Sequence, residues 1–306
     1  MRSVKDYILL FLKGIGMGGA DVVPGVSGGT LAFITWIYEE FLRSIKSFDS
    51  KAVQLLVTCK FSYFWEHING SFLSVLLAGI ILSILSLARI IHYFLEQHPI
   101  ELWSFFFGLI IISAITVTRE INKWNYVVIG AGIAGIVLAY FITDAAPAST
   151  PECYLYIFFA GAIAICAMIL PGISGSFILL ILGKYQFIIS ALKDLDVGIL
   201  VVFALGCITG LLSFARLISW FLNKYRNMAI ALLAGFMIGS LNKIWPWKET
   251  ITFRTDRAGD LVPLVQENIL PHKYYAVTGE SPQMLMALLF VAIGILIVII
   301  IEKISN

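Results

Sequence analysis

Two proline–glycine motifs, each inside a long apolar stretch, constrain the fold of this chain more than any other feature. Pro24–Gly29 reads PGVSGG within residues 7–45, and Pro171–Ser176 reads PGISGS within residues 154–192. Because proline lacks an amide hydrogen and glycine adopts dihedral angles that other residues avoid, each motif ends one helix and lets another begin. Each stretch therefore predicts two helical arms around a break, which form either a re-entrant hairpin or two full spans.

The chain around these motifs is too apolar for a soluble protein. Of its 306 residues, 59% are hydrophobic and 13% are charged, whereas soluble domains carry roughly 25% charged residues. This composition excludes a soluble enzyme, a disordered chain and a nucleic-acid binder with a basic surface. Further apolar runs are long enough to cross a bilayer at residues 72–95, 100–117, 126–143, 197–222, 228–245 and 284–301. The polar segment 246–283 predicts an extramembrane loop.

The sequence also repeats itself at two constant offsets. The motifs lie 147 residues apart, and Gly14, Ala20 and Tyr38 have identical partners at the same offset. The offset then becomes 127, because residues 47–70 form a longer loop in the first half. At this second offset Gly79, Ala88, Arg89 and Gly108 match Gly206, Ala215, Arg216 and Gly235.

We therefore predict an all-α polytopic membrane protein built from two repeats, residues 1–143 and 144–306. Each repeat consists of a broken or re-entrant hairpin, at residues 7–45 or 154–192, followed by three transmembrane helices. Because three is an odd number, the second repeat must be inserted upside down relative to the first. Inverted-topology repeats whose broken helices meet near the bilayer midplane are an architecture of transporters.

The distribution of basic residues predicts the orientation. On a topology with both termini in the cytoplasm, most lysines and arginines outside the polar loop lie at cytoplasmic ends, as the positive-inside rule requires. The short external loop 144–152 has no lysine or arginine, and the polar loop 246–283 is long enough to cross despite its charges. We expect a multi-pass protein of the bacterial cytoplasmic membrane, and the sequence leaves a homo-oligomer open.

Each motif predicts a helix start whose backbone N–H groups lack acceptors within the helix. The positive end of the helix dipole lies there, and an anionic oxygen is a natural partner for these donors. The alternative is that Ser27 and Ser174 only cap helices while the glycines allow close packing. The candidate anion-binding residues are Gly25, Val26, Ser27, Gly28, Gly29 and Thr30 of the first motif, and Gly172, Ile173, Ser174, Gly175 and Ser176 of the second.

Three charged residues in or beside apolar helices need an explanation. Arg89 and Arg216 occupy equivalent positions of the repeat, and the inverted arrangement puts them toward the outer and inner leaflets. They are candidate counter-charges for a travelling phosphate, but each can instead extend to the membrane interface. Asp21, whose counterpart is Met168, is a candidate coupling residue or proton carrier, a partner for an arginine, or a helix cap.

No cofactor or metal is expected from the sequence. The four histidines show no metal-ligand spacing, and the four cysteines show no CxxC spacing. Gly14–Gly19 satisfies the pattern GxGxxG, but no strand precedes it and it lies in an apolar segment. A dinucleotide site is therefore not predicted.

The surroundings of both motifs carry a family resemblance. The stretch from Lys13 through Thr30, followed by Ile37–Glu39, and the second motif Leu170–Ser176 resemble the bacterial polyprenyl-phosphate translocases (PopT), long catalogued as a domain of unknown function. The resemblance covers residues 10–245 and does not include the loop 246–283.

The resemblance implies a transporter rather than an enzyme. Such a protein returns undecaprenyl phosphate from the outer to the inner leaflet, where the lipid is reused for peptidoglycan and other envelope polymers. The phosphate would cross by alternating access between the motifs, while the polyprenyl tail remains in the lipid. Two other function classes stay open, a channel or transporter for a small soluble anion and a membrane enzyme such as a lipid phosphatase. The sequence disfavours the phosphatase, because it has no clustered histidine, aspartate and arginine.

Overall fold

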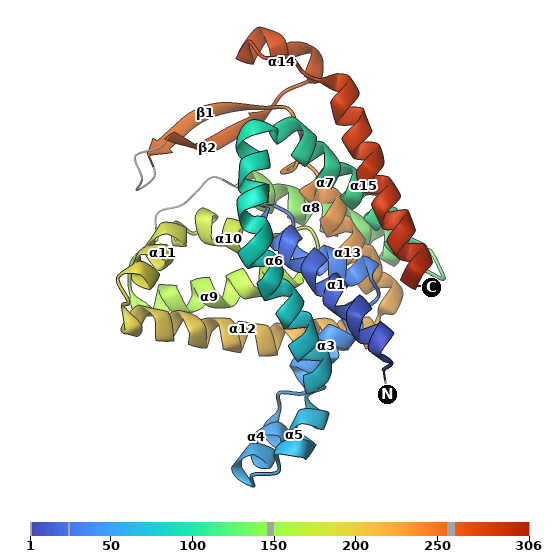
Figure 1. Cartoon of the computed structure of the whole chain (residues 1–306), viewed down its shortest axis with the longest axis vertical. Helices are drawn as coiled ribbons and strands as arrows, with labels where there is room; N and C mark the ends of the chain where they lie inside the picture. Colours follow the sequence, from blue (N-terminus) through green and yellow to red (C-terminus); the bar gives the residue numbers. More distant parts are fainter. Residues whose placement is uncertain (1, 24, 146–149, 256–260, 306) are drawn as a thin grey trace.

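The computed structural model describes residues 2–23, 25–145, 150–255 and 261–305 (Figure 1). The first half contains α1 (Val4–Val22), α2 (Gly28–Ile34), α3 (Tyr38–Lys46), α4 (Ser50–Val57), α5 (Phe61–His67), α6 (Gly70–Gln97), α7 (Pro99–Thr118) and α8 (Tyr126–Asp144). The second half contains α9 (Tyr154–Ile169), α10 (Gly175–Ile181), α11 (Tyr185–Lys193), α12 (Val197–Lys224), α13 (Arg226–Ser240), β1 (Lys248–Thr255), β2 (Leu261–Asn268), α14 (Pro271–Thr278) and α15 (Met284–Ser305).

The apolar runs form helices, as the sequence predicts. In the part of the chain that the structure describes, α6, α7, α8, α12 and α15 are long and apolar enough to cross a membrane. Helices α10 and α11, bent by 107°, make a sixth crossing element if they are counted as one broken span. A mostly helical, multi-pass membrane protein is thereby confirmed.

Each motif separates a long helix from a short one. Helix α1 has 19 residues and α9 has 16, whereas α2 and α10 have 7 each. At about 1.5 Å per residue, a helix of this size is about 10 Å long, far less than the roughly 30 Å of a bilayer core. Helices α2 and α10 are therefore too short to cross the bilayer by themselves, and in the second half α10 with α11 forms either a re-entrant segment or a broken span.

Helix α13 is shorter than the sequence predicts. The apolar run 228–245 predicts a span, but the helix ends at Ser240 after 15 residues. The polar residues Asn242 and Lys243 interrupt the run, and the Lys243 N–H donates to the Ser240 carbonyl oxygen at 2.9 Å in the turn that follows. The helix packs against α7 and α8, and most of its residues are buried.

The elements of the two halves coincide at the offsets found in the sequence. The pairs α2 and α10, and α3 and α11, begin and end 147 residues apart, while α6 and α12 lie 127 residues apart. Helix contacts recur in the same way. Helix α1 packs on α6, as its counterpart α9 packs on α12. Helix α7 packs on α15, as its counterpart α13 packs on α8. The structure thus extends the repeat from residues to elements, and the upside-down insertion of the second half stays a prediction.

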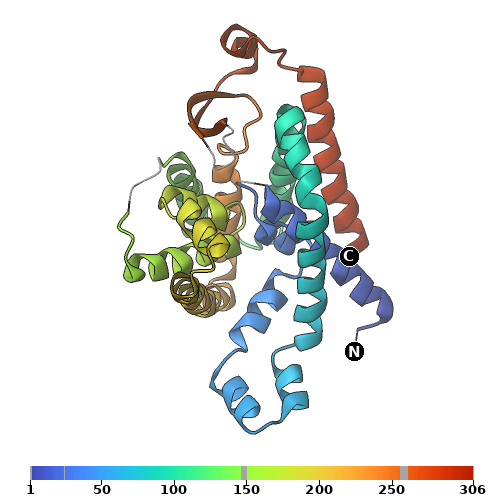
Figure 2. The same ribbon diagram turned by 60° about the vertical axis from the view of Figure 1, so that its left-hand side comes forward.

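Two segments that the sequence predicts only as loops are folded. Residues 246–283 contain the antiparallel β1–β2 pair and α14, so the chain is mostly helical and the prediction of an all-α protein is wrong here. The strands form where β-branched residues, which suit a pleated surface, are frequent: Thr250, Ile251, Thr252 and Thr255 in β1, and Val262 and Val265 in β2. Residues 47–70 contain the α4–α5 helix pair, which projects away from the rest of the protein (Figure 2).

The ends of the chain lie close to each other in both views (Figures 1 and 2). They lie far from α14 and the β1–β2 pair, which occupy another end of the molecule. This arrangement is compatible with termini on one side and the polar segment on the other.

Candidate functional site

Both motifs contain a glycine whose backbone conformation other residues rarely adopt. Gly25 has a φ of 85° and Gly172 a φ of 90°, in the left-handed region. A Cβ atom at position 172 would also lie 2.6 Å from the Ser240 Oγ, and one at position 25 would lie 3.0 Å from the Lys243 Cγ. The chain therefore reverses at each motif against the end of α13.

The two motifs are in direct contact, although they lie 147 residues apart in the sequence. The Ser27 hydroxyl donates to the Met168 carbonyl oxygen at 2.9 Å, and the Gly172 N–H donates to the Thr30 Oγ1 at 3.0 Å. Ser27 and Thr30 have no exposed surface. The two breaks thus form one buried junction, which we call the motif junction.

The start of α2 already has acceptors within the chain. The Asp21 carboxylate accepts a hydrogen bond from the Gly28 N–H at 2.7 Å, and the Ser27 Oγ accepts one from the Gly29 N–H at 3.1 Å. Asp21 is therefore a helix cap in this structure, one of the three roles that the sequence leaves open. An anion of the protein itself occupies the place where the sequence predicts a bound ligand.

The start of α10 differs from that of α2. Met168 stands where the first half has Asp21, and among the described residues no side chain caps α10. The Ser174 and Ser176 hydroxyls lie 2.8 Å apart, and Ser176 is exposed whereas Ser174 is buried. The remaining candidate residues belong to the segments that form the motif junction: Val26, Ile173 and Gly175. The side chains of Val26 and Ile173 are buried.

The structure does not bring Arg89 or Arg216 to the motif junction. Both side chains lie on exposed faces, of α6 and α12. The Arg216 guanidinium donates to the Phe48 carbonyl oxygen at 3.1 Å, and Arg89 has no hydrogen bond or ion pair among the described residues. Neither arginine therefore faces the motif junction, and extension to the membrane interface stays the alternative.

A polar pocket of about 330 Å³ adjoins the motif junction under strand β2. We call it the β2 pocket, and it is lined by Tyr140, Thr143, Asp144, Ala145, Phe177, Leu180, Ile181, Asn242, Lys243, Lys248, Val265, Gln266, Glu267 and Asn268. Lys243 connects the two places, because its Cγ faces Gly25 and its Nζ lies 4.5 Å from the centre of the Phe177 ring.

Sequence reasoning missed both lysines of this pocket. Lys243 lies inside the predicted span 228–245, where a charged residue is costly and marks a functional candidate. That signal was available in the sequence. Lys248 carries no such signal, since only the folding of strand β1 brings it beside Lys243.

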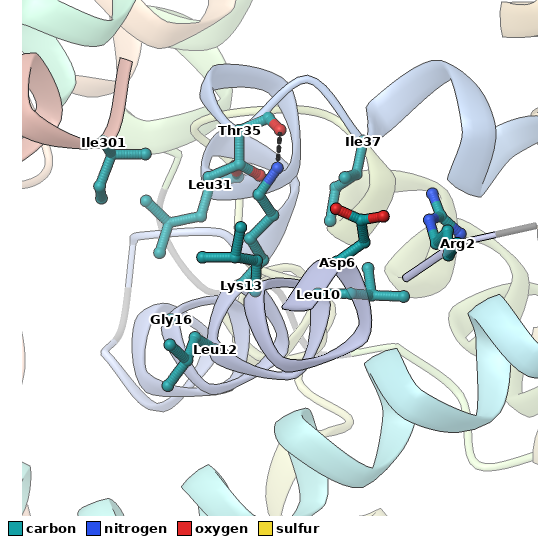
Figure 3. Close-up of a pocket in the computed structure, with 11 residues that line it drawn as sticks. Arg2, Asp6, Leu10, Leu12, Lys13, Gly16, Leu31, Thr35, Ile37 and Ile301 are labelled. Atoms are coloured by element: carbon teal, nitrogen blue, oxygen red, sulfur yellow. Dashed lines mark hydrogen bonds between the residues drawn. The ribbon is translucent and has the colours of Figure 1, made fainter. Parts of the chain in front are cut away.

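A larger, mostly apolar pocket of about 560 Å³ lies between α1, α2 and the end of α15 (Figure 3). The Lys13 Nζ extends across it to the Thr35 carbonyl oxygen at 2.8 Å, at the C-terminal end of α2, where a positive charge suits the helix dipole. Arg2, on its rim, forms an ion pair with Glu40. We call this the α1 pocket.

The second half has a pocket in the equivalent place, but without the charges. Its volume is about 370 Å³. Its residues Tyr156, Phe159, Ala160, Ile163 and Leu182 stand 147 positions after Leu9, Leu12, Lys13, Gly16 and Thr35 of the α1 pocket. The two hairpins therefore share a shape and differ in charge, as Asp21 and Met168 do.

The fold and the motif junction define a class, the multi-pass helical membrane proteins in which two broken hairpins meet inside the protein. Comparison with known proteins then gives the family. Residues 17–262 match the family described as VCA0040-like, undecaprenyl phosphate translocase-like. The chain belongs to this family, and the resemblance found in the sequence is confirmed.

Two relatives extend the match over most of the chain. A protein of Vibrio cholerae serotype O1 named polyprenyl-phosphate transporter is 44% identical over 301 residues, which are 98% of each chain. A protein of Staphylococcus aureus with the same name is 34% identical over 254 residues, 77% of this chain and 85% of the relative. No solved structure matches the chain.

Proposed function

We propose that this protein transports a polyprenyl phosphate, undecaprenyl phosphate in particular, from the outer to the inner leaflet of the bacterial cytoplasmic membrane. The observation that carries the proposal is the motif junction, where two helix breaks from distant parts of the chain meet beside a polar pocket. The relatives named polyprenyl-phosphate transporter, one of them aligned over 98% of this chain, support the substrate. No feature of the described site calls for a catalysed reaction in addition to transport.

In this proposal the phosphate binds at the paired motifs while the tail stays in the lipid. Moving only the headgroup through the protein avoids exposing a phosphate to the hydrocarbon core. The two halves act as inverted repeats with both termini in the cytoplasm, and exchanging their conformations opens the junction to one side and then to the other. Arg89 and Arg216 then act at the two membrane surfaces, near the start and end of the path, rather than at the junction.

Asp21 gives this transport a means of coupling. Its carboxylate holds the Gly28 N–H at 2.7 Å, which is one of the donors that a phosphate would use. Two anions cannot share one donor group without strong repulsion. A phosphate that binds at α2 must therefore displace the Asp21 carboxylate, and protonation of its free oxygen lowers the cost of that exchange. Asp21 is in this way the proposed proton carrier.

The experiment that tests this function measures lipid movement directly. The purified full chain is placed in liposomes with a fluorescent short-chain polyprenyl phosphate, and the label in the outer leaflet is destroyed by a membrane-impermeant reductant. Transport predicts that label from the inner leaflet also disappears within the assay, whereas protein-free liposomes keep it. A label that stays protected would contradict the proposal.

A second arm separates the lipid transporter from the soluble-anion alternative. The same liposomes are tested for uptake of radioactive inorganic phosphate. Uptake of inorganic phosphate without lipid movement would replace the proposed function by that alternative.

A further inference from the structure

The β2 pocket has a charge arrangement that the rest of the fold does not explain. The Lys243 Nζ contacts the Phe177 ring and has no hydrogen-bond acceptor or ion pair among the described residues. The Lys248 Nζ lies 4.0 Å from the centre of the Trp103 ring and donates to the Lys243 carbonyl oxygen at 2.6 Å. Two lysine side chains thus share one pocket, and the aromatic faces and a carbonyl oxygen supply only partial negative charge.

The environment opposes both positive charges. Burial, and then the positive charge of Lys243, lower the pKa of Lys248 from 10.5 to about 7, although its side chain keeps some accessible surface. The loss of water around a charged group is costly unless an opposite charge replaces it. An anion in the pocket would therefore relieve the desolvation of Lys248 and its repulsion by Lys243.

The pocket also contains two carboxylates, which belong at its rim. Asp144 and Glu267 are exposed, whereas Lys243 and Lys248 are half-buried. Neither carboxylate forms an ion pair with a lysine among the described residues, and charges in contact with water are strongly screened. Burial lowers the pKa of Lys243 and Asp144 raises it in part, whereas burial and Lys243 both lower the pKa of Lys248 and no carboxylate offsets them. The inner part of the pocket around Lys248 therefore has no opposite charge.

The walls of the pocket connect it to two places. Strand β2 covers it with Val265–Asn268, and Asn268 is fixed to the end of α13 by a bond from its Nδ2 to the Asn242 carbonyl oxygen at 2.7 Å. On the other side Lys243 faces Gly25, and Phe177 belongs to α10 of the second motif. A ligand in the pocket would therefore lie between the polar extramembrane segment and the motif junction.

We propose that the β2 pocket captures a phosphate monoester headgroup on the external side of the protein, with Lys243 and Lys248 as its counter-charges. The inference rests on the proposed transport function and names the place where the substrate first binds. The volume of about 330 Å³ suits a headgroup with the first part of its chain rather than a whole polyprenyl lipid. Lys243, at the border of the pocket, then passes the phosphate to the motif junction.

The test compares binding of farnesyl phosphate, farnesol and inorganic phosphate to the purified full chain in detergent, followed by tryptophan fluorescence. We expect Lys243→Gln and Lys248→Gln to weaken farnesyl phosphate binding at least 10-fold each, and to leave farnesol binding unchanged. Lys273→Gln is the control, because Lys273 is an exposed lysine of α14 outside the pocket. Thermal unfolding of each variant verifies the fold, and Lys243→Gln keeps the test decisive if Lys248→Gln fails to fold.

Three results would overturn the assignment. If Lys243→Gln binds farnesyl phosphate with an affinity within 2-fold of wild type, Lys243 does not belong to the binding site. Inorganic phosphate that binds as tightly as farnesyl phosphate would make the pocket a site for free phosphate instead of a lipid headgroup. If wild-type protein moves lipid in liposomes and both lysine variants bind farnesyl phosphate normally, only the assignment of the pocket is refuted. If wild-type protein moves no lipid, the proposed function itself is refuted.

Discussion

The Thr30 hydroxyl accepts a hydrogen bond from the Gly172 N–H at 3.0 Å, so a side chain of one motif holds the backbone of the other. Thr30 is completely buried, and Gly172 is buried in a left-handed conformation. An amide in such a place has no water to replace a lost acceptor. The two halves are thus joined at their breaks by a specific polar contact, in addition to apolar packing.

Substitution of Thr30 tests the strength of this contact. Thr30→Val keeps the shape of the side chain but removes the acceptor, so the Gly172 N–H remains buried and unsatisfied. We expect a loss of about 1–3 kcal/mol in the free energy of unfolding, seen as a lower unfolding temperature in detergent. Thr30→Ser keeps the hydroxyl and is the control. Equal unfolding temperatures for the valine variant and wild type would show that the contact contributes nothing.

The packing of α1 on α6 depends on the absence of a side chain at Gly79. A Cβ atom there would lie 2.3 Å from the Phe11 carbonyl oxygen and 3.0 Å from the Gly14 Cα, both backbone atoms that cannot move aside separately. Gly79→Ala should therefore separate the helices and cost about 1–3 kcal/mol. Gly130→Ala, in open space on α8, should leave the unfolding temperature unchanged or raise it. A Gly79→Ala variant as stable as Gly130→Ala would contradict this account.

Much of the architecture could be predicted from the sequence, because two signals act locally. Long apolar runs gave most helix boundaries within a few residues, and the motifs marked both helix breaks. The repeat also pointed to contact between the motifs, which Ser27 and Thr30 make. The β1–β2 pair and the α4–α5 pair were missed, because segments outside the lipid were interpreted from polarity alone.

The candidate site was harder to predict than the helices. An apolar transmembrane helix shows little periodicity, so the sequence does not indicate which face carries Arg89 or Arg216. The capping of α2 by Asp21 depends on a chain reversal across the motif, which spacing alone does not give. Lys243 and Lys248 become neighbours through the turn after α13 and the start of strand β1 that follows it. Contacts of this kind depend on tertiary structure and cannot be derived from composition.

An ion-pair cluster links the two halves at the ends of α3, α7 and α13. The Arg226 guanidinium contacts the carboxylates of Glu39 and Glu120, the second at 2.8 Å. Burial raises the pKa of Glu120 above its ordinary value of 4.5, and Glu39 adds to this, while Arg226 acts in the opposite direction. A raised pKa means that the folded state holds the proton more tightly than the unfolded state. This contribution to stability is complete below pH 4.5 and is lost as the pH rises through the folded pKa.

Glu120→Gln removes this titration and tests its sign. We expect the unfolding temperature of the variant, relative to wild type, to increase from pH 4 to pH 7. Glu66→Gln is the control, because Glu66 is exposed and its side chain forms no ion pair in the described part of the chain. A difference between Glu120→Gln and wild type that falls over this pH range would show that the attraction of Arg226 outweighs burial.

The competition between Asp21 and a bound phosphate gives the sharpest prediction for the motif junction. In Asp21→Asn the amide oxygen can still accept from the Gly28 N–H, so the fold is kept while the negative charge is lost. A charge at a helix start contributes about 0.5–1 kcal/mol, so farnesyl phosphate should bind about 2- to 5-fold more tightly to this variant than to wild type. Lipid movement in liposomes should at the same time become slower and less dependent on pH, because no proton can be carried. Asp21→Glu, which keeps the charge, should retain a pH-dependent rate. Weaker farnesyl phosphate binding by Asp21→Asn would show that Asp21 supports the ligand instead of competing with it.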